Sequence, residues 1–64
     1  MKNRVKELRK NQKLTQEELA ELIGISRQAI NAIEKEKFDP SLPTAFKMAG
    51  LFKTTIEDLF IFNK

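Results

Sequence analysis

The chain has 64 residues and a formal net charge of +3, with 12 Lys and Arg against 9 Asp and Glu, and it contains neither Cys nor His. At this length, residues 1–64 are expected to form one domain that buries about 60% of the surface of the unfolded chain. Without Cys or His, disulfides, thiol catalysis, histidine bases and nearly all zinc sites are excluded, so we expect no metal, no cofactor and no small-molecule ligand. No apolar run approaches the roughly 20 residues of a transmembrane helix, and no apolar segment of a signal peptide follows the basic N-terminus. The expected location is the cytoplasm, without membrane contact.

The first expected helix covers about residues 3–12 and buries Val5 and Leu8, with Arg9 beside them. Basic residues crowd this part of the chain: Lys2, Arg4, Lys6, Arg9, Lys10 and Lys13. Such a cluster fits a polyanionic partner, while a solvated surface of mixed charge accounts equally for most of these residues taken singly.

Residues 16–35 have the pattern of two short amphipathic helices, about 16–23 and 27–34, joined by a tight turn. Ala20 is a small residue at which a second helix can cross the first one closely. Gly24 takes a left-handed backbone conformation with little steric cost, so it ends the first of the two helices and turns the chain.

Both of these helices begin with capping residues. Thr15 and Glu18 are spaced as a capping box, and Ser26 is placed as the N-cap of the second helix. The second helix has an inward apolar stripe of Ile25, Ile30 and Ile33 and an outward polar face of Arg27, Gln28 and Asn31. This layout is typical of a DNA-binding helix-turn-helix, whose second helix lies in the major groove. An ordinary helical hairpin would need only the apolar spacing.

Two further helices are expected after a loop over residues 35–40, which ends before a proline. Ser41 is placed to cap the first of them, and Pro43 is tolerated in its first turn. Its apolar residues predict a central position in the domain: Leu42, Ala45, Phe46, Ala49 and Phe52. Thr55 is placed to cap a short fifth helix over residues 56–60.

The chain then carries four successive large apolar residues: Leu59, Phe60, Ile61 and Phe62. They exceed what one face of a short helix can bury, which predicts that they form the interface of a homodimer. The alternative is that this tail seals the core of its own chain. Because its aromatic and β-branched residues favour extended structure, residues 61–64 are also expected to pair as a short strand with residues 1–4.

With these residues in view, the chain resembles the phage Cro and repressor type of helix-turn-helix domain, also called the xenobiotic-response-element family. The resemblance spans residues 5–60, and five motifs carry it: VKELR in the first helix, LTQEELA at 14–20, GISRQAI at 24–30, IEK at 33–35 and PSL at 40–42. The chain looks most like the very short regulators of the cytolysin-repressor type. The resemblance implies an all-α, five-helix, lambda-repressor-like fold, to which the pairing of the termini would add a two-stranded β element.

The resemblance also implies a function. The chain would be a transcriptional regulator, most simply a repressor, that binds a palindromic operator in double-stranded DNA as a homodimer. Helices 27–34 of two copies would enter successive major grooves roughly 34 Å apart. Base edges would be contacted by Arg27, Gln28 and Asn31. The DNA backbone would be contacted by Gln16, Ser26, Lys35, Lys37 and Ser41, and Gln16 would also brace Gln28.

Two more expectations follow from the same resemblance. Arg9 and Glu34 match a pair that forms a salt bridge between the first and third helices. Glu36 departs from the family, which usually has Gly or Asn after the third helix. Either Glu36 accepts a strained left-handed conformation, or the helix ends differently.

Two other classes of function were weighed. A protein-interaction module, such as an antitoxin, would need a further segment able to wrap its partner, and the apolar tail is the one candidate. An enzyme is not expected, because nothing marks a nucleophile, a base and a pocket together. The carboxylates fall in or near the first turns of helices, where they complement the helix dipole: Glu17, Glu18, Glu21, Glu57 and Asp58.

Overall fold

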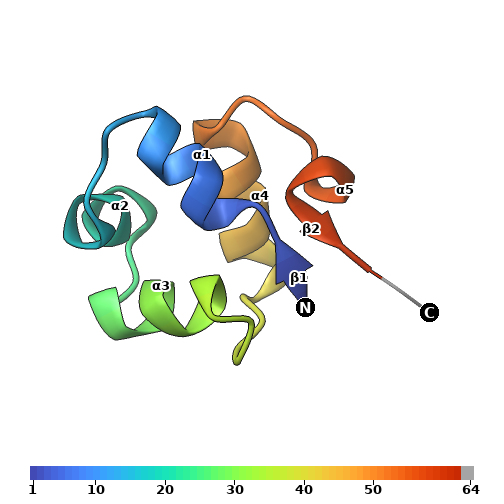
Figure 1. The fold of residues 1–64 in the computed structure, drawn as a ribbon, viewed down its shortest axis with the longest axis horizontal. Helices are drawn as coiled ribbons and strands as arrows, with labels where there is room; N and C mark the ends of the chain where they lie inside the picture. Colours follow the sequence, from blue (N-terminus) through green and yellow to red (C-terminus); the bar gives the residue numbers. More distant parts are fainter. Residues whose placement is uncertain (63–64) are drawn as a thin grey trace.

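The computed structural model describes residues 1–62, and five helices form most of this part of the chain (Figure 1). The helices are α1 (Val5–Asn11), α2 (Gln16–Ile23), α3 (Arg27–Glu34), α4 (Leu42–Leu51) and α5 (Ile56–Leu59). Two short strands, β1 (Lys2–Asn3) and β2 (Phe60–Ile61), pair antiparallel and join the two ends of the chain. The predicted five-helix fold with a strand pair between the termini is confirmed. None of the helices within residues 1–62 is both long and apolar enough to cross a bilayer.

The strand pair begins earlier in the C-terminal segment than predicted. Lys2 lies opposite Ile61 and Asn3 lies opposite Phe60, so the second strand starts at Phe60 rather than at Ile61. Positions 63 and 64, which belonged to the predicted strand, lie outside the described residues. The N–H of Arg4 also donates to the carbonyl oxygen of Leu59 at 2.9 Å. These bonds fix the start of α1 beside the end of α5.

The helix starts are capped as predicted. Thr15 Oγ1 accepts a hydrogen bond from the N–H of Glu18 at 3.0 Å, and Glu18 Oε1 accepts one from the N–H of Thr15 at 2.8 Å. Ser26 Oγ accepts from the N–H of Ala29 at 3.0 Å. Between these caps, Gly24 has a φ of 88°, so it ends α2 in the left-handed region that glycine occupies without strain. Local chemistry thus sets both ends of the turn between α2 and α3.

Three other helices end with a left-handed residue that is not glycine. These residues are Lys13 after α1 (φ 58°), Glu36 after α3 (φ 63°) and Lys53 after α4 (φ 55°). In each case the N–H of the next residue reaches a carbonyl five residues back, as in a Schellman motif. The bonds run from Leu14 to Arg9 (3.1 Å), from Lys37 to Ala32 (3.0 Å) and from Thr54 to Ala49 (2.9 Å). Of the two alternatives for Glu36, the structure shows the strained left-handed conformation.

The core gathers residues from every helix and from β2. Its buried members are Val5, Leu19, Ala20, Ile23, Ile30, Ile33, Ala45, Met48, Ala49, Phe52, Leu59 and Phe60. Helix α4 crosses the middle of the molecule behind α1 (Figure 1). Two of the apolar residues from which its central position was predicted, Leu42 and Phe46, are nevertheless 64% and 61% exposed. The inward stripe of α4 has the helical spacing 45, 48, 49 and 52. Phe46 lies off this stripe, and Leu42 lies beyond the edge of the core.

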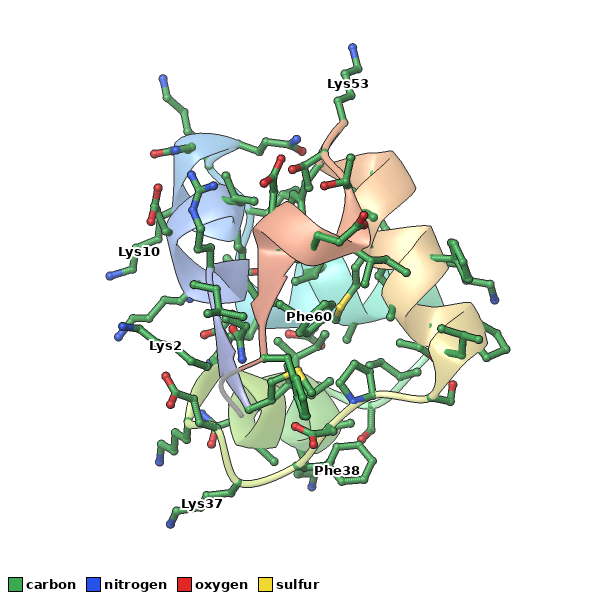
Figure 2. The ribbon with its side chains drawn as sticks, turned by 90° about the vertical axis from the view of Figure 1, so that its right-hand side faces the viewer. Lys2, Lys10, Lys37, Phe38, Lys53 and Phe60 are labelled. Atoms are coloured by element: carbon green, nitrogen blue, oxygen red, sulfur yellow. The ribbon has the colours of Figure 1, made fainter. Side chains whose placement is uncertain are left out.

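The apolar tail divides between the core and the surface. Leu59 is fully buried and Phe60 is 7% exposed, and Figure 2 shows Phe60 near the centre of the molecule. Both residues are packed into the core of their own chain, so they offer less surface to a second copy than the rest of the tail. Ile61 is half-buried and Phe62 is 70% exposed. The tail thus seals its own core with two residues and leaves two accessible.

Candidate nucleic-acid interface

Helix α3 lies along the lower edge of the molecule in Figure 1, and one of its faces is polar and accessible to solvent. Ile30 and Ile33 are fully buried against the rest of the domain. Arg27 and Gln28 are exposed, and Asn31 is half-buried. Because positions three and four apart share a helix face, these three polar residues form one surface. The structure therefore groups the three predicted base-contacting residues.

A hydrogen-bond network joins this face to α1 and α2. Arg9 Nε donates to Glu34 Oε2 at 2.7 Å, and Arg9 Nη2 donates to Glu34 Oε1 at 3.2 Å. Arg9 Nη1 donates to the carbonyl oxygen of Leu14 at 2.8 Å. Gln16 Nε2 donates to Glu34 Oε1 at 3.1 Å, and Asn31 Nδ2 donates to Gln16 Oε1 at 3.4 Å. The expected ion pair is present, and it is the buried end of a chain of contacts that reaches the exposed face.

The residue that Gln16 braces differs from the expected one. Gln16 was expected to hold Gln28, but its side-chain oxygen accepts from Asn31. Asn31 and Glu34 are three residues apart on α3, so both face the first residue of α2. Gln28 lies one turn earlier on α3 and is exposed. The way in which α2 packs against α3 therefore places Asn31, rather than Gln28, within reach of Gln16.

The predicted backbone-contacting residues lie around the ends of α3. Ser26 and Ser41 are exposed N-caps of α3 and α4, and they border the same hollow between these helices. Lys35 and Lys37 are exposed immediately after α3. Figure 2 shows Lys37 extending at the lower end of the molecule, while Lys53 extends at the opposite end. Lys37 thus places a positive charge near α3, whereas Lys53 places one far from it.

Two residues beside this face were not singled out from the sequence. Phe38 is an exposed aromatic residue that borders the hollow between α3 and α4, and it stands in a segment expected only to be a loop. Asn3 Nδ2 donates to the carbonyl oxygen of Ile33 at 2.9 Å, and Asn3 Oδ1 accepts from the N–H of Val5 at 3.1 Å. Asn3 thereby holds the end of α3 against the start of α1. Its distance along the chain from Ile33 hides this contact from local pattern analysis.

Two exposed ion pairs compensate part of the positive charge near the N-terminus. Arg4 Nη2 donates to Glu7 Oε2 at 3.0 Å, and this hydrogen bond lowers the pKa of the Glu7 carboxyl and raises the pKa of Arg4. The α-amino group of Met1 lies 3.0 Å from Asp39 Oδ1. Exposed pairs of this kind contribute little to stability. They do engage two cationic groups, the Arg4 guanidinium and the Met1 α-amino group, which could otherwise bind a polyanion.

Comparison with known proteins decides the family. A family model described as helix-turn-helix matches residues 5–59, which include all five helices. The chain belongs to the Cro/C1-type helix-turn-helix transcriptional regulators. Members of this family bind DNA and are not enzymes, so the expectation of a DNA-binding regulator without enzymatic activity is confirmed.

Individual relatives agree with this assignment. An uncharacterized HTH-type transcriptional regulator of Methanocaldococcus jannaschii is 56% identical over 63 residues, covering 98% of this chain and 96% of the relative. The uncharacterized HTH-type transcriptional regulator YgzD of Bacillus subtilis is 47% identical over 60 residues, covering 94% and 91%. The immunity repressor protein of Bacillus phage phi105 is 45% identical over 47 residues, which are 73% of this chain and 33% of the phage protein.

Proposed function

We propose that this DNA-binding regulator is a repressor that binds a palindromic operator as a homodimer. The observation that carries the proposal is the exposed polar face of α3, with Asn31 held in place from behind by Gln16. A recognition helix needs side chains that reach base edges from a rigid support. Repression is favoured by the likeness to the phage immunity repressor. The finer likeness to the cytolysin-repressor type and a cytoplasmic location belong to the same proposal.

Within this proposal the side chains of α3 have different tasks. Arg27 can donate two hydrogen bonds to guanine, and Gln28 can pair with adenine through both ends of its amide. Asn31 is the third base-contacting residue. These contacts supply specificity, since major-groove edges differ between base pairs.

The affinity comes mainly from contacts to phosphates, which also set the register of the protein on DNA. Lys35 and Lys37 supply charge after α3. Gln16, Ser26 and Ser41 supply polar groups at the starts of α2, α3 and α4. Helix starts suit this task because their N–H groups point toward an anion.

The proposed homodimer uses a mainly apolar surface that does not include α3 and that also contains Lys2 and the Met1–Asp39 ion pair. Its most exposed apolar members are Leu42 and Phe46 of α4 and Phe62 of the tail. Three adjoining hollows connect these residues. Ile56 lines both the first and the second hollow, which lie beside α4, and Met1 lines both the second and the third, which lies nearest the tail. Large exposed apolar surfaces mark interaction sites, and a two-fold axis would bring the same surface of two copies together. Of the predicted interface residues, Ile61 and Phe62 remain in this proposal.

Selection of duplexes from a random pool tests the proposal. A dimer on a palindrome should yield two inverted half-sites whose centres lie one helical turn apart, or a multiple of it. A consensus with a single half-site would contradict the dimer. Recovery of duplexes without any shared sequence would contradict sequence-specific binding.

A further inference from the structure

In the hydrogen-bond network behind α3, the charged pair at the inner end fixes which groups donate and which accept. The proposed base contacts do not by themselves require this arrangement. The guanidinium of Arg9 can only donate hydrogen bonds, and the carboxylate of Glu34 can only accept them. The side chain of Glu34 is only 3% exposed, and both of its oxygens accept from Arg9. The inner end of the network is therefore the Glu34 carboxylate, which can only accept hydrogen bonds.

This acceptor fixes the orientation of Gln16. A side-chain amide has an NH2 group at one end and an oxygen at the other, and only the NH2 group can bond to a carboxylate. Gln16 Nε2 lies 3.1 Å from Glu34 Oε1, so Gln16 Oε1 must point away from Glu34. It points toward Asn31, where it can only accept.

The same reasoning fixes Asn31. Because Gln16 offers an oxygen, Asn31 turns its Nδ2 toward Gln16, at 3.4 Å. The Oδ1 atom of Asn31 and one remaining Nδ2 hydrogen are then left for other partners. Without this constraint the amide of Asn31 could rotate by half a turn and present its NH2 group instead.

We propose that Glu34, acting through Gln16, is a positioning residue that makes Asn31 prefer an amino-bearing base over a keto-bearing base. The inference rests on the proposed base contact of Asn31. In the major groove, adenine and cytosine present an exocyclic amino group that donates to an oxygen. Guanine and thymine present oxygens at the corresponding positions, which a fixed amide oxygen would repel. Adenine suits best, because its N7 also accepts the remaining Nδ2 hydrogen.

The test begins with the base pair that Asn31 reads. Duplex selection with Asn31→Ala identifies it as the position at which the preference disappears. Affinities are then measured for duplexes that carry each of the four bases at that position. The unmodified chain should bind adenine or cytosine there more tightly than guanine or thymine. Tighter binding of guanine or thymine would overturn the inference.

Two variants release Asn31 in different ways. Gln16→Met removes the amide and leaves the Arg9–Glu34 pair intact. The double variant Arg9→Met/Glu34→Met keeps Gln16 but removes the acceptor that orients it, with no change in net charge. In both, the ratio of amino-base to keto-base affinity should fall about fivefold, the factor that one net hydrogen bond supplies. Gln12→Met is the matched control, because Gln12 bonds to Leu51 at the end of α4 and should leave the ratio unchanged.

The outcomes separate this inference from the proposed function. If both variants weaken binding to all four bases by the same factor, the network is only structural and the inference is wrong, while the proposed function stands. If the unmodified chain selects no consensus at all, the proposed function is wrong and the inference falls with it.

Discussion

Arg9 and Glu34 meet in a two-point ion pair that joins α1 to α3, with Nε–Oε2 and Nη2–Oε1 distances of 2.7 and 3.2 Å. Only 10% of the Arg9 side chain and 3% of the Glu34 side chain are exposed. The planar guanidinium matches the two carboxylate oxygens, which lysine could not do. The pair therefore fixes how the proposed recognition helix sits on the domain.

The first prediction concerns the stability of this pair. Arg9→Met or Glu34→Met alone should lower the free energy of unfolding by about 3–5 kcal/mol, because each leaves a buried charge without its partner. A core of this size rarely supplies more than about 3–5 kcal/mol in total, so either single variant should be largely unfolded at 25 °C. The double variant should be more stable than both. Urea unfolding followed by circular dichroism measures this, and a double variant less stable than either single one would contradict it.

The second prediction concerns the strained end of α3. Glu36→Gly should stabilise the fold by about 1 kcal/mol, because glycine adopts the left-handed conformation without the penalty that Glu36 bears. For a domain of this size the melting temperature should rise by about 4–8 °C. Lys53→Gly, in the same kind of helix end far from α3, should stabilise by a similar amount.

Gly24→Ala should lower the melting temperature in the same thermal melts. Nothing lies within 4 Å of a Cβ built at Gly24, so the cost of the substitution is backbone strain alone, about 1 kcal/mol.

DNA affinity should differ between the two stabilised variants, Glu36→Gly and Lys53→Gly, because Glu36→Gly also removes a negative charge beside the proposed phosphate contacts. Equal affinities for Glu36→Gly and Lys53→Gly would argue against α3 facing DNA.

Local features of the sequence were enough to place the helices. Caps such as Thr15 and Ser26 act within one turn, and the apolar period of α3 fixes its buried face without reference to other elements. The exposed polar face of α3 follows from the same period. The group of proposed base-contacting residues could thus be predicted from the sequence.

What remained out of reach depends on how elements meet. Gln16 braces Asn31 because of the angle between α2 and α3, which no local pattern encodes. Leu59 is buried because β1 and the helices cover it, and Phe46 is exposed because nothing packs over its side of α4. At Glu36 the sequence showed a conflict with the family, but only the structure shows that backbone strain is how it is resolved.

The third prediction separates base contacts from phosphate contacts. Gln28→Ala should lose about 1–3 kcal/mol of discrimination at one base pair and leave the fold intact, since Gln28 is exposed. Lys37→Ala should weaken all sequences alike and reduce the slope of log affinity against log salt by about 0.9. Lys53→Ala is the control for lost charge, because Lys53 extends from the opposite end of the molecule in Figure 2. Parallel losses of specific and non-specific binding in Gln28→Ala would show that Gln28 does not read a base.

The last prediction concerns the homodimer. Phe62 is the most exposed large apolar residue of the described chain, at 70%, so Phe62→Asp removes little from the core. It would place a charge in the proposed two-fold interface, where the same residue of both copies comes close to the axis. The variant should therefore be a folded monomer that binds a single half-site weakly.

Sedimentation at high micromolar concentration, with and without operator, measures the expected change. Leu22→Asp is the matched control, because Leu22 is an exposed apolar residue of α2 outside the proposed interface and the charge change is the same. It should leave the oligomeric state unchanged. A monomeric unmodified chain under both conditions would refute the homodimer. Dissociation by Leu22→Asp but not by Phe62→Asp would move the interface to another face of the molecule.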